Sequence, residues 1–168
     1  PIEIPVSSTT GKVVIPDIES SSNLYVSCFE HQTPLLTINA EGSITEYDSD
    51  YTITQFSKSI SLSNNETVWL TRSTFDGGGI IALDLEDDSF RVITTADELP
   101  NNTVNSVAIS LNDEAWVATN SGLVSFNDAT FIFDDFNAIE AIFDTDALFS
   151  GQTITAVAID GGNRIWVG

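Results

Sequence analysis

Hydrophobic and polar residues alternate over short stretches along most of the chain, a period typical of β-strands with one buried face. Asn- and Gly-rich turns separate these stretches, for example Asn112-Asp113 and Asn120-Ser121-Gly122. Residues 137–148 have helix-like apolar spacing, which we interpret as a short turn in an extended loop. The predicted strands are 12–18, 23–29, 34–39 and 42–48; 57–62, 67–73, 79–84 and 88–94; 104–110, 114–119, 122–127 and 129–134; and 154–160 and 164–168.

The strand groups are copies of one repeat. Trp116 recurs as Trp166 after 50 residues, and the segment from Leu99 to Phe126 matches the segment from Phe149 to Gly168 almost position for position. Trp69 lies 47 residues before Trp116, and Tyr25 takes the Trp place another 44 residues upstream. Steps of 44, 47 and 50 residues are close to the roughly 40–50 residues of one propeller blade.

The repeat predicts an all-β fold, a portion of a β-propeller with about three and a half four-stranded antiparallel blades. The blades are expected at 12–48, 57–94 and 104–134, with an incomplete one at 154–168, in a single domain over 1–168. The first strand of each blade has large residues on one face and small ones on the other, which suits inner strands that interdigitate. The predicted structural core of the blades consists of Trp69, Trp116, Trp166, Val107, Ile109, Val157 and Ile159.

The last blade contains only two predicted strands, because the sequence stops at Gly168. Open strand edges and an exposed apolar face favour pairing. We therefore expect the remaining blades to come from the same protein or from another chain, and we expect self-association through the open half-blade. The absence of an initiator Met at Pro1 indicates a mature or excised piece of a longer precursor.

The net charge of the chain disfavours some classes of binding partner. Twenty-five acidic residues against five basic ones give a net charge of −20, which disfavours nucleic acid and anionic membranes. The acids are spread over many loops, so we interpret them mainly as a solubilising surface; binding of divalent cations or of a basic partner is the alternative.

The sequence offers few candidate catalytic residues. A single Cys28 and a single His31 cannot form a closed zinc site, and Cys28 lies in an apolar stretch typical of a buried, inert thiol. The run Gly77-Gly78-Gly79 precedes a strand rather than a helix, so it is not a phosphate loop. We predict no enzyme activity and no cofactor. Carboxylate pairs that could instead hold Ca²⁺, but that we interpret as solvated turn acids, are Asp48/Asp50, Glu86/Asp87/Asp88, Asp134/Asp135 and Asp144/Asp146.

Binding is the better-supported chemistry. The loops that join the fourth strand of one blade to the first of the next, and the second strand to the third, gather on one face of a propeller. Their amides and hydroxyls suit neutral polar ligands such as sugars, although the same residues are also good turn formers. The longer segment from Phe136 to Ser150 either carries function or caps this face. The candidate ligand-binding residues are Asn101, Asn102, Thr103, Asn120, Ser121, Gln152 and Thr153.

The run from Leu99-Pro-Asn-Asn-Thr-Val to Trp116-Val-Ala-Thr-Asn-Ser-Gly-Leu resembles the two-component regulator propeller repeat. The resemblance is strong at 99–127 and 149–168 and weaker at 57–84. Two departures are Ala118, where the repeat usually has Gly, and residues 73–79, which lengthen a loop. The resemblance implies a propeller of seven blades in the bacterial cell envelope, in the periplasm or outside the cell, often as the sensor region of a hybrid histidine kinase that responds to carbohydrates.

Three functions follow in order of preference. The first is an extracytoplasmic recognition propeller, part of a two-component sensor that binds a saccharide or another small polar ligand. The second is a secreted or cell-surface propeller that mediates protein or polysaccharide interaction. The third is a propeller enzyme of the lyase type, for which the sequence offers the least support.

Overall fold

The computed structural model describes residues 13–14, 23–28, 35–47, 57–64, 67–84, 89–126 and 148–168. These residues form strands and two short 3₁₀ helices, η2 (Thr74–Asp76) and η3 (Thr95–Asp97). The strands are β1 (Val13–Val14), β2 (Asn23–Cys28), β3 (Leu35–Asn39), β4 (Ile44–Tyr47), β5 (Ile60–Leu62), β6 (Thr67–Thr71), β7 (Ile80–Asp84), β8 (Phe90–Ile93), β9 (Val104–Ile109), β10 (Ala115–Thr119), β11 (Gly122–Phe126), β12 (Val157–Ile159) and β13 (Ile165–Val167).

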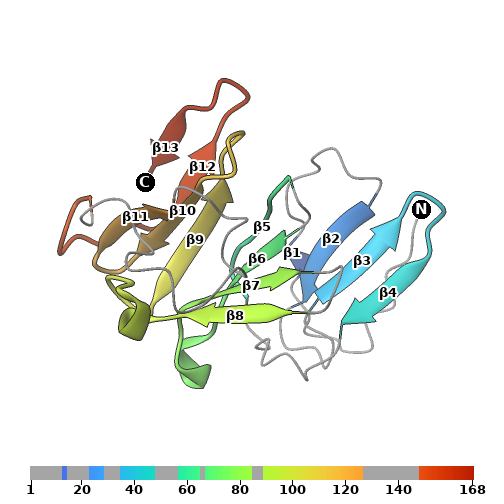
Figure 1. Ribbon diagram of the computed structural model, residues 1–168, viewed down its shortest axis with the longest axis horizontal. Coiled ribbons are helices and arrows are strands. Elements are labelled where there is room, and N and C mark those ends of the chain that lie inside the picture. The colour runs from blue at the N-terminus through green and yellow to red at the C-terminus, as the bar shows by residue number, and fades with distance from the viewer. Residues whose placement is uncertain are drawn as a thin grey trace.

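The strands form four antiparallel sheets, each an up-and-down meander in chain order (Figure 1). The sheets are β1-β2-β3-β4, β5-β6-β7-β8, β9-β10-β11 and β12-β13. Every one of these strands lies within a range predicted from the alternation of the sequence. The predicted all-β, partial propeller is therefore confirmed, while the predicted strand at 129–134 and, apart from Leu148, the turn within 137–148 lie outside the described residues.

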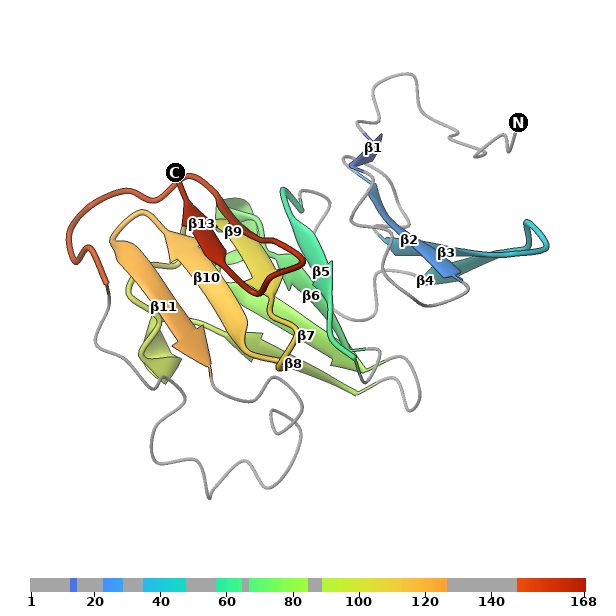
Figure 2. The same ribbon diagram turned by 90° about the horizontal axis from the view of Figure 1, so that it is seen from above.

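The sheets β5–β8, β9–β11 and β12–β13 lie against one another in that order (Figure 2), and the alternation along each strand decides which neighbour a side chain meets. In the sheet β9–β11, Val107 and Val117 pack against the sheet β5–β8. The intervening Ala108 and the half-buried Trp116 face β12–β13 instead. On the inner strands, the small Ala108 meets Val157 of the next sheet, which allows close approach.

The repeated Trp shows how this packing changes along the chain. Trp69 is completely buried, and its ring centroid lies 5.7 Å from that of Phe126 in the next sheet. Trp116 is half-buried beside Ala118, whereas Trp166 on β13 is 59% exposed. Of the other predicted core residues, Val107 and Val157 are buried, and Ile109 and Ile159 are half-buried against the same clusters.

The sheet β1–β4 contributes Leu35 to a second core. Leu35 is fully buried against Ile60, Leu70 and Leu83 of the sheet β5–β8. The interpretation of Cys28 as a buried thiol, and the position of His31, concern side chains outside those that the structure describes.

Serine side chains add hydrogen bonds between the inner strands. Ser59 Oγ accepts from Val107 N at 3.2 Å and contacts Val107 O at 3.3 Å. One repeat later, Ser106 Oγ donates to Val157 O at 3.2 Å. The equivalent position thus joins the segment before β5 to β9, and β9 to β12, and a net contribution of about 1 kcal/mol is typical of such a bond.

Candidate ligand-binding face

Two kinds of loop meet at one end of the sheets. The loop between β6 and β7 contains η2, and the loop between β8 and β9 contains η3, near the same end of the strands (Figure 1). Gly79 N donates to Asn102 O at 2.7 Å, and Thr95 N donates to Asn102 Oδ1 at 2.7 Å. Asn102 therefore joins the two loops through its carbonyl and orders its own loop through its side chain.

The glycine run has a structural role at this junction. Gly78 has φ of +69°, and a Cβ there would lie 2.2 Å from Asn102 O. Gly79 has φ of +93°, and a Cβ there would lie 2.3 Å from Ile93 O. Only glycine allows both the left-handed backbone and the close approach.

The next pair of loops repeats this arrangement in simpler form. The two-residue turn between β10 and β11 contacts the segment that leads into β12, since Gly151 N donates to Ser121 O at 3.1 Å. Thr153 Oγ1 donates to Asn120 O at 3.3 Å. Asn105 Nδ2 contacts both Asn120 Oδ1 and Ile154 O at 2.9 Å.

Most of the candidate ligand-binding residues serve these junctions. Asn101 Nδ2 donates to Ser121 Oγ at 3.0 Å, and Asn101 Oδ1 accepts from Thr103 N at 2.8 Å. Thr103 O in turn accepts from Asn120 N at 3.1 Å. The structure therefore brings Asn101, Asn102, Thr103, Asn120, Ser121 and Thr153 to one end of the sheets and uses their polar groups between and within the loops.

Several residues at this end are exposed. Among the candidate residues these are Asn120, Gln152 and Thr153. Phe75, on η2, is 90% exposed and was not predicted as a site residue. The signal in the sequence was an aromatic residue inside a Gly-rich loop extension, at 73–79.

The opposite end carries the tight turns between first and second strands. Asp113 Oδ1 accepts from Asn64 N at 2.8 Å, and Asp113 Oδ2 accepts from Asn64 Nδ2 at 3.0 Å. Fifty residues later, Asn163 Oδ1 accepts from Leu111 N at 2.9 Å. Asp113 and Asn163 both have φ near +60°, a conformation that Asn and Asp tolerate better than most residues.

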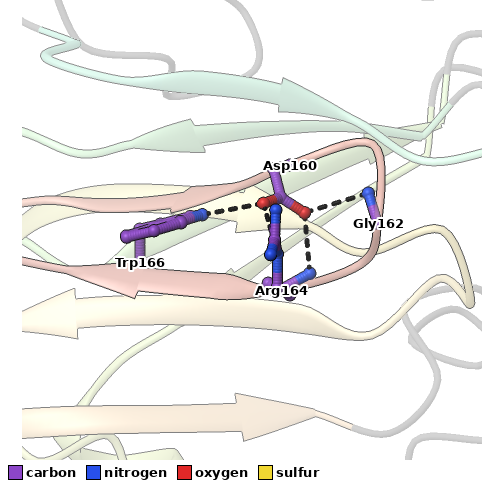
Figure 3. Close-up of polar contacts among 4 residues, drawn as sticks. All are labelled: Asp160, Gly162, Arg164 and Trp166. Atoms are coloured by element: carbon purple, nitrogen blue, oxygen red, sulfur yellow. Dashed lines mark hydrogen bonds and ion pairs between the residues drawn. The ribbon is translucent and has the colours of Figure 1, made fainter.

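A carboxylate organises the last of these turns (Figure 3). Asp160 Oδ1 accepts from the backbone N–H groups of Gly162 and Arg164, at 2.9 and 3.1 Å. Asp160 Oδ2 accepts from Arg164 Nε at 2.8 Å and from Trp166 Nε1 at 3.0 Å. The hydrogen bond from the Arg164 backbone, followed by that from the Trp166 indole, lowers the pKa of Asp160 because these bonds favour the charged form.

Neither a metal centre nor a membrane span stands out in the part of the chain that the structure describes. Its His, Cys, Asp and Glu side chains form no group of three that could hold a metal ion. The carboxylate pairs considered for Ca²⁺ all lie outside that part. Among the described elements, no helix is long and apolar enough to cross a membrane.

Comparison with known proteins places the chain among β-propellers. No family profile and no curated protein matches the sequence. Among solved structures, the chain is similar to the extracellular domain assigned to the hybrid two-component system BT3049 of B. thetaiotaomicron, with 20% identity and a TM-score of 0.67 over 94% of the chain. It is also similar to PorZ, a bacterial surface component of the type-IX secretion system of Porphyromonas gingivalis, with 14% identity and a TM-score of 0.67 over 94% of the chain.

These neighbours agree with the resemblance drawn from the repeat, and at such identities they establish the fold. The chain spans about a fifth of the BT3049 domain and 24% of PorZ. A luciferin-regenerating enzyme is similar at a lower TM-score of 0.55, with 14% identity, 93% of the chain and 52% of the enzyme covered. The propeller fold therefore accommodates sensors, surface components and an enzyme, and the site has to decide among them.

Proposed function

We propose that this chain is part of a propeller outside the cytoplasm that recognises a saccharide or another small polar ligand within a bacterial two-component sensor. The observation that supports the proposal most is the agreement between the repeat and the fold of the BT3049 extracellular domain over 94% of the chain. The remaining blades, from the same protein or from another chain, complete the recognition surface.

The chemistry of the loop end supports a neutral polar ligand. Amide and hydroxyl groups can each donate and accept hydrogen bonds, as sugar hydroxyls require, and Gln152 presents such an amide to solvent. The net charge of −20 disfavours anionic ligands at long range. Neutral saccharides are therefore preferred to sulfated or uronic ones.

The second candidate is a surface propeller that mediates protein or polysaccharide interaction without a signalling module. The observation that favours it is the equal TM-score of 0.67 to PorZ. A lyase-type enzyme is the third candidate. Its support is limited to the weaker likeness to the luciferin-regenerating enzyme.

Isothermal titration calorimetry of the protein with a panel of oligosaccharides tests the proposal. The panel holds neutral glucans, galactans, mannans and xylans, with polygalacturonate and heparin as anionic comparisons. We expect binding to a neutral member, unchanged by EDTA and without turnover of the ligand. Absence of binding to every saccharide contradicts the assignment of a saccharide as the ligand, and product formation that EDTA abolishes supports the enzyme instead.

A further inference from the structure

The strand β13 has one edge that is not paired within the part of the chain that the structure describes. The equivalent strands β6 and β10 each lie between two neighbours, whereas β13 pairs with β12 alone (Figure 1). The side chains of Ile165, Trp166 and Val167 are also exposed, at 37%, 59% and 41%. An open strand edge with exposed apolar side chains is a template to which another extended segment can add.

The hydrogen bonds between β12 and β13 show which backbone groups this edge offers. Gly168 N donates to Ala156 O, and Ala156 N donates to Gly168 O, both at 3.0 Å. Hydrogen-bonded and non-hydrogen-bonded pairs alternate in an antiparallel ladder, so Trp166 is the next residue along β13 that bonds to β12. The N–H and C=O groups of Ile165 and Val167 therefore point to the open edge.

The two preceding sheets indicate the sequence of a strand that fits this edge. Trp69 lies opposite Ala82 in the first of them. Trp116 lies opposite Ser125 in the second, so both tryptophans have a small partner on the third strand. Before the small residue come a large aliphatic and a β-branched residue, and a large apolar residue follows it. The two runs are Ile80-Ile81-Ala82-Leu83 and Leu123-Val124-Ser125-Phe126.

The last residue of the second run also contacts the preceding sheet. The ring centroid of Phe126 lies 5.7 Å from that of Trp69. Trp116 is the equivalent of Trp69 one repeat later, but it is half-buried and faces β12–β13. An aromatic residue placed opposite Ile165 by an added strand lies on this same face, and it would contact Trp116 as Phe126 contacts Trp69.

We propose that the open edge of β13 binds an extended polypeptide segment by antiparallel strand addition. The segment has the pattern large aliphatic, β-branched, small and large apolar, and it is a third strand of this same repeat. Backbone hydrogen bonds to Ile165 and Val167 provide affinity, and the small residue opposite Trp166 fixes the register. This binding mode is independent of the saccharide proposed as the ligand.

A synthetic peptide with the sequence of β11, Gly122–Phe126, flanked by uncharged polar residues, tests the proposal. Its binding to the protein is followed by amide hydrogen exchange in NMR spectra. At a peptide concentration ten times the dissociation constant, exchange of the Ile165 and Val167 amides should slow about tenfold. Exchange of the Leu111 amide, in the turn between β9 and β10, serves as the control and should not change.

Methylation of single peptide nitrogens tests the register. In β11 the N–H groups of Val124 and Phe126 face β10, because Leu123 bonds to Leu148 on the opposite side. A methyl group on either of the two equivalent peptide nitrogens should weaken binding about fivefold or more, since each removes one hydrogen bond. A methyl group on the nitrogen of the peptide's leucine or serine is the matched control, and this peptide should bind as well as the unmodified one.

Two results would overturn the proposal. A scrambled peptide of the same composition that binds equally well would show apolar adhesion without a register. Failure of the β11 peptide to slow exchange at Ile165 and Val167 would show that this edge does not accept a strand. Both results leave the proposed saccharide ligand unaffected, because that ligand is assigned to the loop end of the sheets.

Discussion

At the scale of single residues, equivalent positions of the repeat make the same hydrogen bonds within a turn, and one of them also binds two further side chains. Ser63, Ser110 and Asp160 occupy the same position, and each side chain accepts hydrogen bonds from the backbone of its own turn. The Asp160 carboxylate also accepts hydrogen bonds from the side chains of Arg164 and Trp166, the Trp of the repeat. The Nε1 atoms of Trp69 and Trp116 are buried without a hydrogen-bond partner, and both repeats have a serine at the position of Asp160.

The lowered pKa of Asp160 makes this turn sensitive to acid. Because the folded state favours the carboxylate, its contribution to stability is present at neutral pH and is lost as pH falls through the lowered pKa. We expect the Trp166 indole N–H resonance in NMR spectra to titrate with a midpoint below that of an ordinary aspartate. Asp160→Asn should abolish this titration, and Asp113→Asn, in the preceding repeat, should leave it in place. A midpoint at or above the ordinary value contradicts the assignment.

At the scale of elements, the strands were predictable and the loop contacts were not. Alternation depends on neighbours two residues apart, so β6 and β10 could be located from local pattern alone. The contact between Gly78 and Asn102 joins residues 24 positions apart and depends on how two sheets pack. The sequence predicts a ligand-binding role for Asn102, and it gives no sign that the carbonyl and the side chain of this residue also hold the loops together.

Substitution of the loop glycines measures the strength of this junction. Gly78→Ala places a Cβ against backbone that cannot easily move, and we expect a loss of about 2–4 kcal/mol in the free energy of unfolding. Gly151→Ala is the matched control, because Gly151 has a similar φ of +78° but nothing within 4 Å of the added Cβ. Its cost should be about 1 kcal/mol, from the backbone alone.

Urea unfolding followed by tryptophan fluorescence checks both values. Equal losses for Gly78→Ala and Gly151→Ala would show that the close approach to Asn102 O carries no energy, and the loop junction would then not be rigid.

At the scale of the whole molecule, the sheet β12–β13 has an exposed face. Trp166 of β13 is 59% exposed and, with Ala158 opposite it, lies on the face turned away from β9–β11. Ile165 and Val167, which are 37% and 41% exposed, alternate to the other face. In the two preceding sheets the equivalent strand contributes residues to the core between neighbours. Trp166 therefore occupies the position that packs between neighbouring sheets in the two preceding repeats, and we expect another blade of this repeat to pack against it.

This surface is expected to cause reversible self-association of the isolated chain. Sedimentation velocity should show a sedimentation coefficient that rises with concentration, because burying exposed apolar area is favourable. Trp166→Glu should reduce the association, and Phe90→Glu, which places the same charge on β8, should not. A protein that remains monomeric at all concentrations contradicts the expectation.

The sequence by itself determined the blades, because alternation and a 47- to 50-residue repeat of Trp, Val and Ile are local patterns that any observer of the chain can count. It also determined which loops share an end, since antiparallel connections leave no other choice. The tertiary structure alone decided how each polar side chain is used. Asn64 and Asp113 are 49 residues apart and meet only because neighbouring sheets stack, whereas Asn101 and Ser121 meet because β9 pairs with β10. Hydrogen-bond partners and exposure depend on the three-dimensional neighbours of a residue, and these do not follow from its place in the repeat.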